Sequence, residues 1–170
     1  MGKLILVTGG VRSGKSSHAL ALAVEAETPV LFVATALASD SEMVERIARH
    51  RSERPGSWRT EEATSGELEE YVSGGEEVAV LDCMTLYVGR RLTEGVDERQ
   101  IAREVEAAVD AMRGSHRLSV VVSNEVGCGI IPDNRLAREF SEALGRANQA
   151  VAAAADEVLF MISGIPLKVK

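Results

Sequence analysis

The chain has few cysteines, few aromatic residues and no long apolar run, and the first and last of these shortages exclude classes of protein. The two cysteines, Cys83 and Cys128, lie far apart and form no Cys-x-x-Cys pair, which excludes a disulfide framework and argues against a zinc site. No apolar stretch approaches the roughly 18 residues of a membrane span, and the N-terminus has no signal-peptide pattern. We therefore expect a cytoplasmic protein that is not an integral membrane protein.

Basic residues are also fewer than acidic residues. The formal net charge is -7, which argues against a surface that coats nucleic acid and favours a small partner. At 170 residues and 45% apolar content, the chain is long enough to bury one full core. We expect a single domain spanning residues 1–170.

Five short runs rich in Val, Ile and Leu are continuous rather than alternating, which is typical of parallel strands covered on both faces. They are Leu4–Thr8, Val30–Ala34, Val78–Asp82, Leu118–Asn124 and Glu157–Ser163. Segments with helical periodicity separate them, among them 15–27, 41–52, 96–112 and 135–154. In such a sheet the loops that follow the strands meet in one crevice, where ligands bind.

The first strand leads into a glycine-rich loop that opens a helix, and this segment matches G-x-x-x-x-G-K-[ST]. Backbone N–H groups of such a loop and the positive end of the helix bind phosphate, Lys15 reaches the β- and γ-phosphates, and the Ser16 hydroxyl holds Mg²⁺. The alternative is a glycine-rich turn that binds nothing. The predicted nucleotide-binding residues are Gly9, Gly10, Val11, Arg12, Ser13, Gly14, Lys15 and Ser16. The expected fold class is α/β, of the P-loop NTPase type (RecA-like), with a mostly parallel sheet and helices on both faces.

Asp82 ends the third of these runs and is the predicted second ligand of Mg²⁺, because a buried strand that ends in an unpartnered carboxylate is costly. Ser123, Asn124 and Glu125 end the fourth run, where Glu125 is a candidate base or metal-supporting group. Ser39 or Asp40, and Asp133 or Asn134, are the predicted helix caps. His18 is expected on a helix surface, and His116 is expected in a polar turn.

His50 shares one face of the predicted helix 41–52 with Met43 and Ile47, and four arginines surround it. One interpretation is a partly buried structural histidine whose arginines form a solvated face. The other is an imidazole held beside a polyphosphate, where it could act as a nucleophile. Glu61 and Glu62 likewise have two interpretations, as ribose ligands or as surface charge. The four arginines are Arg46, Arg49, Arg51 and Arg54.

Taken together and in order, five segments resemble one family, the bifunctional adenosylcobinamide kinase / adenosylcobinamide-phosphate guanylyltransferases of cobalamin biosynthesis. They are Thr8–Ser16, Arg46–Pro55, Trp58–Thr60, Leu81–Cys83 and Asn124–Arg138. The resemblance implies that ATP or GTP phosphorylates adenosylcobinamide with catalysis by Lys15, that GTP guanylylates His50, and that GMP then passes to adenosylcobinamide phosphate. It further implies trimers, and GTP contacts at Ala34, Thr35, Ala36, Arg51, Ser52, Glu53, Arg54, Glu62 and Asp82.

Two alternatives stay open at this point. Another P-loop small-molecule kinase would need Lys15, Ser16 and Asp82 but would give His50 no covalent role. A nucleotide-sensing module without catalysis would need only the phosphate-binding loop.

Overall fold

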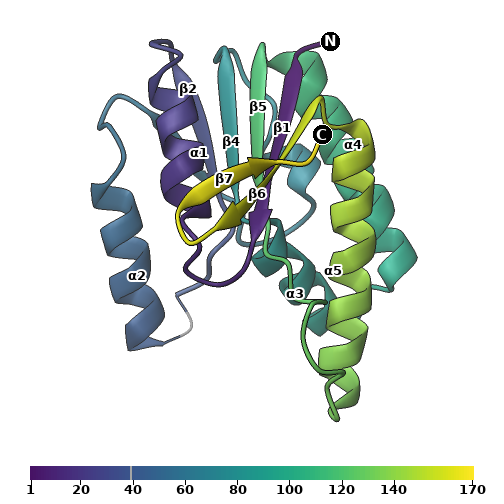
Figure 1. Cartoon of the computed structure of the whole chain (residues 1–170). Coiled ribbons are helices and arrows are strands. Elements are labelled where there is room, and N and C mark those ends of the chain that lie inside the picture. Colours follow the sequence, from purple (N-terminus) through teal and green to yellow (C-terminus); the bar gives the residue numbers. More distant parts are fainter. Residues whose placement is uncertain (39) are drawn as a thin grey trace.

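A computed structural model describes residues 1–38 and 40–170, with the side chain of Arg46 outside the description. Seven strands form one sheet in the order β3-β2-β4-β5-β1-β6-β7 (Figure 1). All neighbouring strands pair in parallel except β6 and β7, which are antiparallel. The strands are β1 (Lys3–Gly9), β2 (Val30–Ala34), β3 (Arg59–Glu62), β4 (Val78–Asp82), β5 (Leu118–Val122), β6 (Glu157–Ile162) and β7 (Ile165–Lys168).

Helices cover both faces of the sheet, as the sequence predicts (Figure 1). Alternate residues of β1 point to opposite faces, so Leu4 and Leu6 join the core beneath α3, α4 and α5, while Ile5 and Val7 join the core beneath α1. Helix α2 lies at the side of the molecule where the parallel strands end. The helices are α1 (Lys15–Val24), α2 (Ser41–Ser52), the 3₁₀ turn η1 (Leu68–Glu70), α3 (Met84–Thr93), α4 (Glu98–Ser115) and α5 (Arg135–Ala154).

Side-chain caps fix where three of the described helices begin, and two of these caps, those of α2 and α5, lie at positions predicted from the sequence. Asp40 accepts a hydrogen bond from the Met43 N–H at 2.8 Å and starts α2, whereas the alternative cap, Ser39, lies outside the described residues. Asn134, not Asp133, caps α5 by accepting from the Ala137 N–H at 3.2 Å. The caps therefore set the start of the helix that carries His50.

Several predicted boundaries are wrong. The fourth predicted strand ends at Val122 and not at Asn124, α1 ends at Val24 and not near residue 27, and α3 and β7 were not predicted. In β7 every residue is exposed, so the strand lacks the buried apolar run used to find the others.

His116 lies in the short polar connection between α4 and β5, as expected, but it is not a surface residue there. Its side chain is buried, and its two ring nitrogens each lie 2.7 Å from a main-chain carbonyl oxygen, that of Glu76 for Nδ1 and that of Val72 for Nε2. The polar residues next to His116 in the sequence give no indication of these contacts, because the two partners lie some 40 residues away. His116 thus ties the end of α4 to the segment before β4.

Within the described ranges, none of the helices has the length and apolar character needed to cross a membrane.

Candidate functional site

Two glycines shape the loop between β1 and α1. Gly9 has a φ of 145°, and a Cβ there would lie 2.6 Å from the carbonyl oxygen of Met161. Gly14, the N-cap of α1, has a φ of 92° and a left-handed conformation, and no side chain caps the helix. With no side-chain cap from the described residues, the N-terminus of α1 presents the positive end of the helix to this loop, where the motif predicts an anion.

The side chain of Lys15 folds back onto this loop. Its Nζ donates to the Gly10 carbonyl oxygen at 2.5 Å, lies 3.4 Å from the Ser13 Oγ, and the residue is only 7% exposed. The ammonium group is thus held inside the loop, next to the open N-terminus of α1. A cation at this place adds to the positive potential of the helix end.

A cavity of about 400 Å³, here the P-loop cavity, opens over this loop. Its lining is largely polar and comes from the loop, from α2 and from the ends of β4 and β5. These residues are Val11, Arg12, Ser13, Gly14, Lys15, Ser16, Ser17, Glu42, Glu45, Arg49, His50, Asp82, Cys83, Val122 and Asn124.

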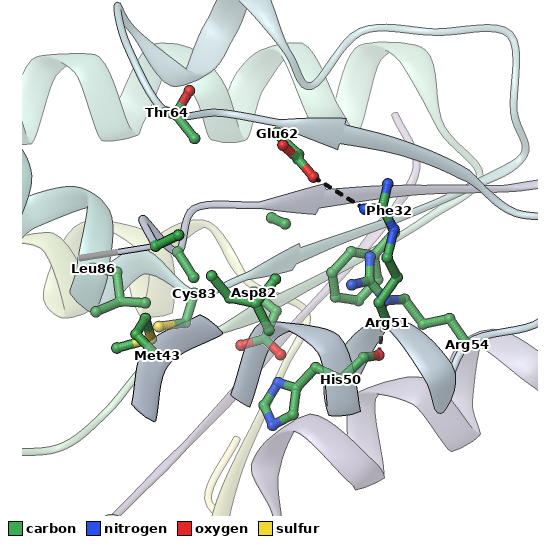
Figure 2. A pocket seen from close by; sticks show the side chains of 14 residues that line it. Phe32, Met43, His50, Arg51, Arg54, Glu62, Thr64, Asp82, Cys83 and Leu86 are labelled. Atoms are coloured by element: carbon green, nitrogen blue, oxygen red, sulfur yellow. Dashed lines mark hydrogen bonds and ion pairs between the residues drawn. The ribbon is translucent and has the colours of Figure 1, made fainter. Parts of the chain in front are cut away.

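A second cavity of about 300 Å³, here the apolar cavity, lies between α2 and the ends of β2, β3 and β4 (Figure 2). Met43, Ile47 and His50 all line it, so the helix face predicted from their spacing faces this cavity. Its full lining is Phe32, Ala34, Ala36, Ala38, Met43, Ile47, His50, Arg51, Arg54, Glu62, Thr64, Asp82, Cys83 and Leu86.

Arg54 is fixed at the wall of the apolar cavity. Its guanidinium carbon lies 4.0 Å from the centre of the Phe32 ring, and its Nε donates to the His50 carbonyl oxygen at 3.0 Å. Burial and the neighbouring charge of Arg51 lower the pKa of Arg54, while Asp82 and Glu62 act in the opposite direction. The contact with the His50 carbonyl ties this cation to the backbone of the histidine.

Three side chains line both cavities: those of His50, Asp82 and Cys83. Figure 2 shows the imidazole of His50, from α2, and the carboxylate of Asp82, from β4, directed toward the same space. Burial and the charge of Asp82 raise the pKa of the Cys83 thiol to about 11, so the thiol is protonated near neutral pH and a poor nucleophile. The groups at this shared boundary that can react with a ligand are therefore the imidazole of His50 and the carboxylate of Asp82.

The P-loop cavity also fits a magnesium ion. Ser16 and Asp82 both line it, and their hydroxyl and carboxylate oxygens are the hard donors that Mg²⁺ prefers. Within the described residues no group of three or more His, Cys, Asp or Glu side chains is arranged to hold a metal. Mg²⁺ commonly takes only one or two protein ligands and fills the rest of its coordination shell with phosphate oxygens and water.

The other predicted nucleotide-binding residues divide into two groups. Ala34, Ala36, Arg51, Arg54 and Glu62 line the apolar cavity, where Arg51 and Glu62 are 3.7 Å apart. The remaining ones are not among the residues that line either cavity in the described part of the chain; they are Gly9, Gly10, Thr35, Ser52 and Glu53.

Thr35 and Ser52 have their hydroxyl groups occupied within the chain. Thr35 is 1% exposed, and its Oγ1 accepts from the Cys83 N–H at 2.8 Å and donates to the Cys83 carbonyl oxygen at 2.7 Å. The Ser52 hydroxyl donates to the Arg49 carbonyl oxygen at 2.7 Å. Glu125, a candidate base from the sequence, accepts from the Gly127 N–H at 2.8 Å, outside the described lining of either cavity.

Sequence reasoning gave no individual role to several residues of the two cavities. Phe32 lies in the middle of a predicted strand, and Leu86, Glu42 and Glu45 were given no place in a site. Asn124 was noticed by its place at the end of a predicted strand but given no role. For Asn124 that position, at the carboxyl end of the sheet, was the available signal.

The fold and the glycine-lined anion site define a P-loop nucleotide-binding protein. Two solved structures share the fold. The first is a KaiC-like protein of Pyrococcus horikoshii OT3, with a TM-score of 0.52 and 15% identity, and the match covers 94% of this chain and 70% of that one. The second is an ATPase of a bacterial type III secretion system, with a TM-score of 0.56 and 9% identity, and the match covers 94% of this chain and 51% of that one.

More particularly, the chain belongs to the cobinamide kinase / cobinamide phosphate guanyltransferase family, whose sequence model matches residues 5–169. It is 42% identical over 182 residues to the bifunctional adenosylcobalamin biosynthesis proteins CobU of Escherichia coli K12 and of Salmonella typhimurium LT2, covering 98% of this chain and 99% of each relative. It is 37% identical over 168 residues to the bifunctional protein CobP of Pseudomonas aeruginosa PAO1, covering 97% of this chain and 96% of the relative. The family resemblance predicted from the motifs is confirmed.

Proposed function

We propose that this enzyme phosphorylates adenosylcobinamide with ATP or GTP and transfers GMP from GTP to adenosylcobinamide phosphate, through a GMP–His50 intermediate. Membership of a family described by these two activities supports the pair of reactions. The observation that carries the covalent route is that His50 lines both the P-loop cavity and the apolar cavity.

The shared position of His50 suits attack on the α-phosphorus of GTP. A triphosphate whose β- and γ-phosphates lie in the P-loop and whose base lies in the apolar cavity has its α-phosphate between the two. The lone pair of one imidazole nitrogen forms the N–P bond, the bond from the α-phosphorus to the α,β-bridging oxygen breaks, and pyrophosphate leaves with that electron pair. The ring then loses its other N–H proton to solvent.

The second half of the transfer restores the histidine. A phosphate oxygen of adenosylcobinamide phosphate bonds to the phosphorus of the bound GMP, the N–P bond breaks, and the electron pair returns to the imidazole nitrogen while the other ring nitrogen takes back a proton from solvent. The product is adenosylcobinamide-GDP. Dividing the reaction in this way replaces one difficult displacement by two easier ones.

Guanine recognition falls to the apolar cavity. Guanine presents two adjacent donors, N1–H and the 2-amino group, that adenine lacks, and a carboxylate accepts from both. Two carboxylates among the described residues line this cavity, and because Asp82 also lines the P-loop cavity we assign this role to Glu62, which lies beside Arg51. Ala34 and Ala36 leave room there for a flat ring.

The kinase step belongs to the P-loop cavity. The hydroxyl oxygen of adenosylcobinamide bonds to the γ-phosphorus while the bond from that phosphorus to the β,γ-bridging oxygen breaks; the electron pair leaves with the diphosphate, and the hydroxyl proton goes to solvent. Lys15 and the N-terminus of α1 stabilise the charge on the phosphate oxygens. Ser16 and Asp82 would hold a magnesium ion here, and that ion would supply positive charge to the same oxygens.

We also propose a cytoplasmic homotrimer, as the resemblance implies. Exposed apolar side chains support self-association: Ile130 is 96% exposed and Ile131 is 79% exposed, on the loop before α5. Light scattering of the purified protein tests the stoichiometry, and a mass of one chain would refute it.

Labelling with GTP tests the covalent route. Incubation with GTP labelled at the α-phosphate should give a protein-bound label that is acid-labile and alkali-stable, and adenosylcobinamide phosphate should discharge it. His50→Ala should abolish the label. His18→Ala is the matched control, since His18 lies on α1 outside the described lining of both cavities, and it should label normally.

The outcomes separate the alternatives. Label that survives in His50→Ala would refute the proposed nucleophile. No protein label, together with transfer of the γ-phosphate to a cobinamide product, would indicate a kinase that makes no covalent intermediate. Tight GTP binding without either transfer would indicate a nucleotide sensor.

A further inference from the structure

Asn124 follows the strand that lies between the P-loop strand and the strand that ends in Asp82. Strand β5 pairs with β1 on one side and with β4 on the other. Asn124 therefore enters the P-loop cavity between the phosphate-binding loop and Asp82, and it is one of the residues that line this cavity. It is not among the described residues that line the apolar cavity.

The hydrogen-bond ladder shows which way the Asn124 side chain points. The pairing of β5 with β1 continues past Val122, because Ser123 N–H donates to the Val7 carbonyl oxygen and Glu125 N–H to the Gly9 carbonyl oxygen, each at 3.0 Å. Side chains alternate along a paired strand, so Asn124 lies on the same face as Val122, which also lines the P-loop cavity. Ser123, on the opposite face, donates to Asn148 of α5 at 2.6 Å.

The backbone of Asn124 is held at both polar groups. Its N–H donates to the Thr85 Oγ1 at 2.8 Å, and its carbonyl oxygen accepts from the Asn148 Nδ2 at 3.0 Å. The bond between Ser123 and the Asn148 Oδ1 fixes which way the Asn148 amide faces. The backbone that carries this side chain is therefore fixed before a substrate arrives, and only the side-chain torsions remain to be ordered.

We propose that Asn124 is a further catalytic residue of the kinase step, whose side-chain amide donates a hydrogen bond to an oxygen of the γ-phosphoryl group as that group moves to the acceptor hydroxyl. This role rests on the proposed kinase function. An amide supplies a neutral donor in the cavity that Lys15 also lines, where negative charge spreads over the γ-phosphate oxygens in the transition state. The α-phosphate, which His50 attacks, lies toward the apolar cavity and away from Asn124.

The two reactions of the enzyme allow an internal control. Removal of one preorganised donor lowers turnover by about 100-fold or more when that donor acts only in the transition state. Asn124→Ala should therefore lower kinase turnover by about 100-fold. The KM for ATP and the initial rate of His50 guanylylation should each change by less than about threefold, because neither depends on charge that develops at the γ-phosphate.

Two further variants separate the amide from its surroundings. Asn124→Asp keeps the shape but replaces the donor by a negative charge, so it should lower kinase turnover at least as much as the alanine variant. Glu125→Gln changes the competing candidate next to it, whose carboxylate bonds the Gly127 N–H instead. Circular dichroism and urea denaturation of each variant establish that it is folded.

Assays with ATP labelled at the γ-phosphate and GTP labelled at the α-phosphate read the two steps separately. Loss of kinase turnover in both Asn124 variants with guanylylation retained supports the role. Undiminished kinase turnover in folded Asn124→Ala, an equal loss of both reactions, or a kinase loss confined to Glu125→Gln would overturn it. Absence of γ-phosphate transfer by the unsubstituted protein would overturn the kinase function together with this role.

Discussion

Replacement of Thr35 by Val tests whether this residue holds the chain beside Asp82. Valine has nearly the shape of threonine, so it keeps the packing and removes only the hydroxyl group. That hydroxyl bonds both the N–H and the carbonyl oxygen of Cys83, the residue after Asp82, and is almost completely buried. The main-chain bond from Thr35 N–H to the Asp82 carbonyl oxygen, at 3.2 Å, does not need the side chain.

The expected cost follows from these contacts. Each lost hydrogen bond is worth about 1 kcal/mol net, and a buried N–H left without an acceptor costs about 1–3 kcal/mol. We therefore expect Thr35→Val to lower the free energy of unfolding by about 2–4 kcal/mol. Thr35→Ser keeps the hydroxyl and loses one methyl group, so its cost should be about 1 kcal/mol.

Urea denaturation measures both free energies of unfolding. An unchanged slope of that free energy against urea concentration shows that the unfolded state is the same. Under the proposed function, the Mg²⁺ concentration for half-maximal kinase activity should also rise in Thr35→Val and stay unchanged in Thr35→Ser, because the first variant frees the backbone next to Asp82. A valine variant as stable as the serine variant, or an identical Mg²⁺ dependence in the two, would refute the reasoning.

Three other substitutions have clear expectations. Lys15→Ala should lower kinase activity by about 100-fold while circular dichroism stays unchanged, because glycines rather than Lys15 set the turn. His116→Ala leaves two carbonyl oxygens without their ring partners and should cost about 2–4 kcal/mol in urea denaturation, against less than about 1 kcal/mol for His18→Ala. Burial acts to raise the pKa of Glu104, but hydrogen bonds from Arg91 and Tyr87 outweigh it and hold this pKa below its ordinary 4.5. The stabilisation is present above that value and is lost as the pH falls through the lower, folded-state pKa, so the acid-induced loss of stability should be shallower in Glu104→Gln.

The parts of the fold that the sequence predicted are those set by local patterns. The apolar runs of β1, β2, β4, β5 and β6 are short but continuous because both faces of these strands are covered, so each is visible on its own. The P-loop was predictable for the same reason, since all of its chemistry lies in eight successive residues. Membership of the family then followed from the order of the motifs.

The parts that the sequence did not predict depend on contacts between distant segments. The two hydrogen bonds of His116 join it to residues 40 and 44 positions away, and nothing near it in the chain indicates them. The anchoring of Asn124 likewise requires Thr85 and Asn148, from α3 and α5. The spacing of Met43, Ile47 and His50 predicted a shared face, but the position of that face between two cavities is a property of the assembled sheet.

The position of His50 between the two cavities explains how one nucleotide site serves both proposed reactions. The kinase step breaks a bond at the γ-phosphorus of the nucleotide, and the guanylyl transfer breaks a bond at its α-phosphorus. These two atoms are two positions apart along the triphosphate. With the base in the apolar cavity and the terminal phosphates against Lys15, His50 and Asp82 lie where the cavities meet. The nucleotide then needs no second binding mode, and the choice between the reactions falls to the acceptor: a hydroxyl near the P-loop takes the γ-phosphoryl group, whereas a phosphate near His50 takes GMP.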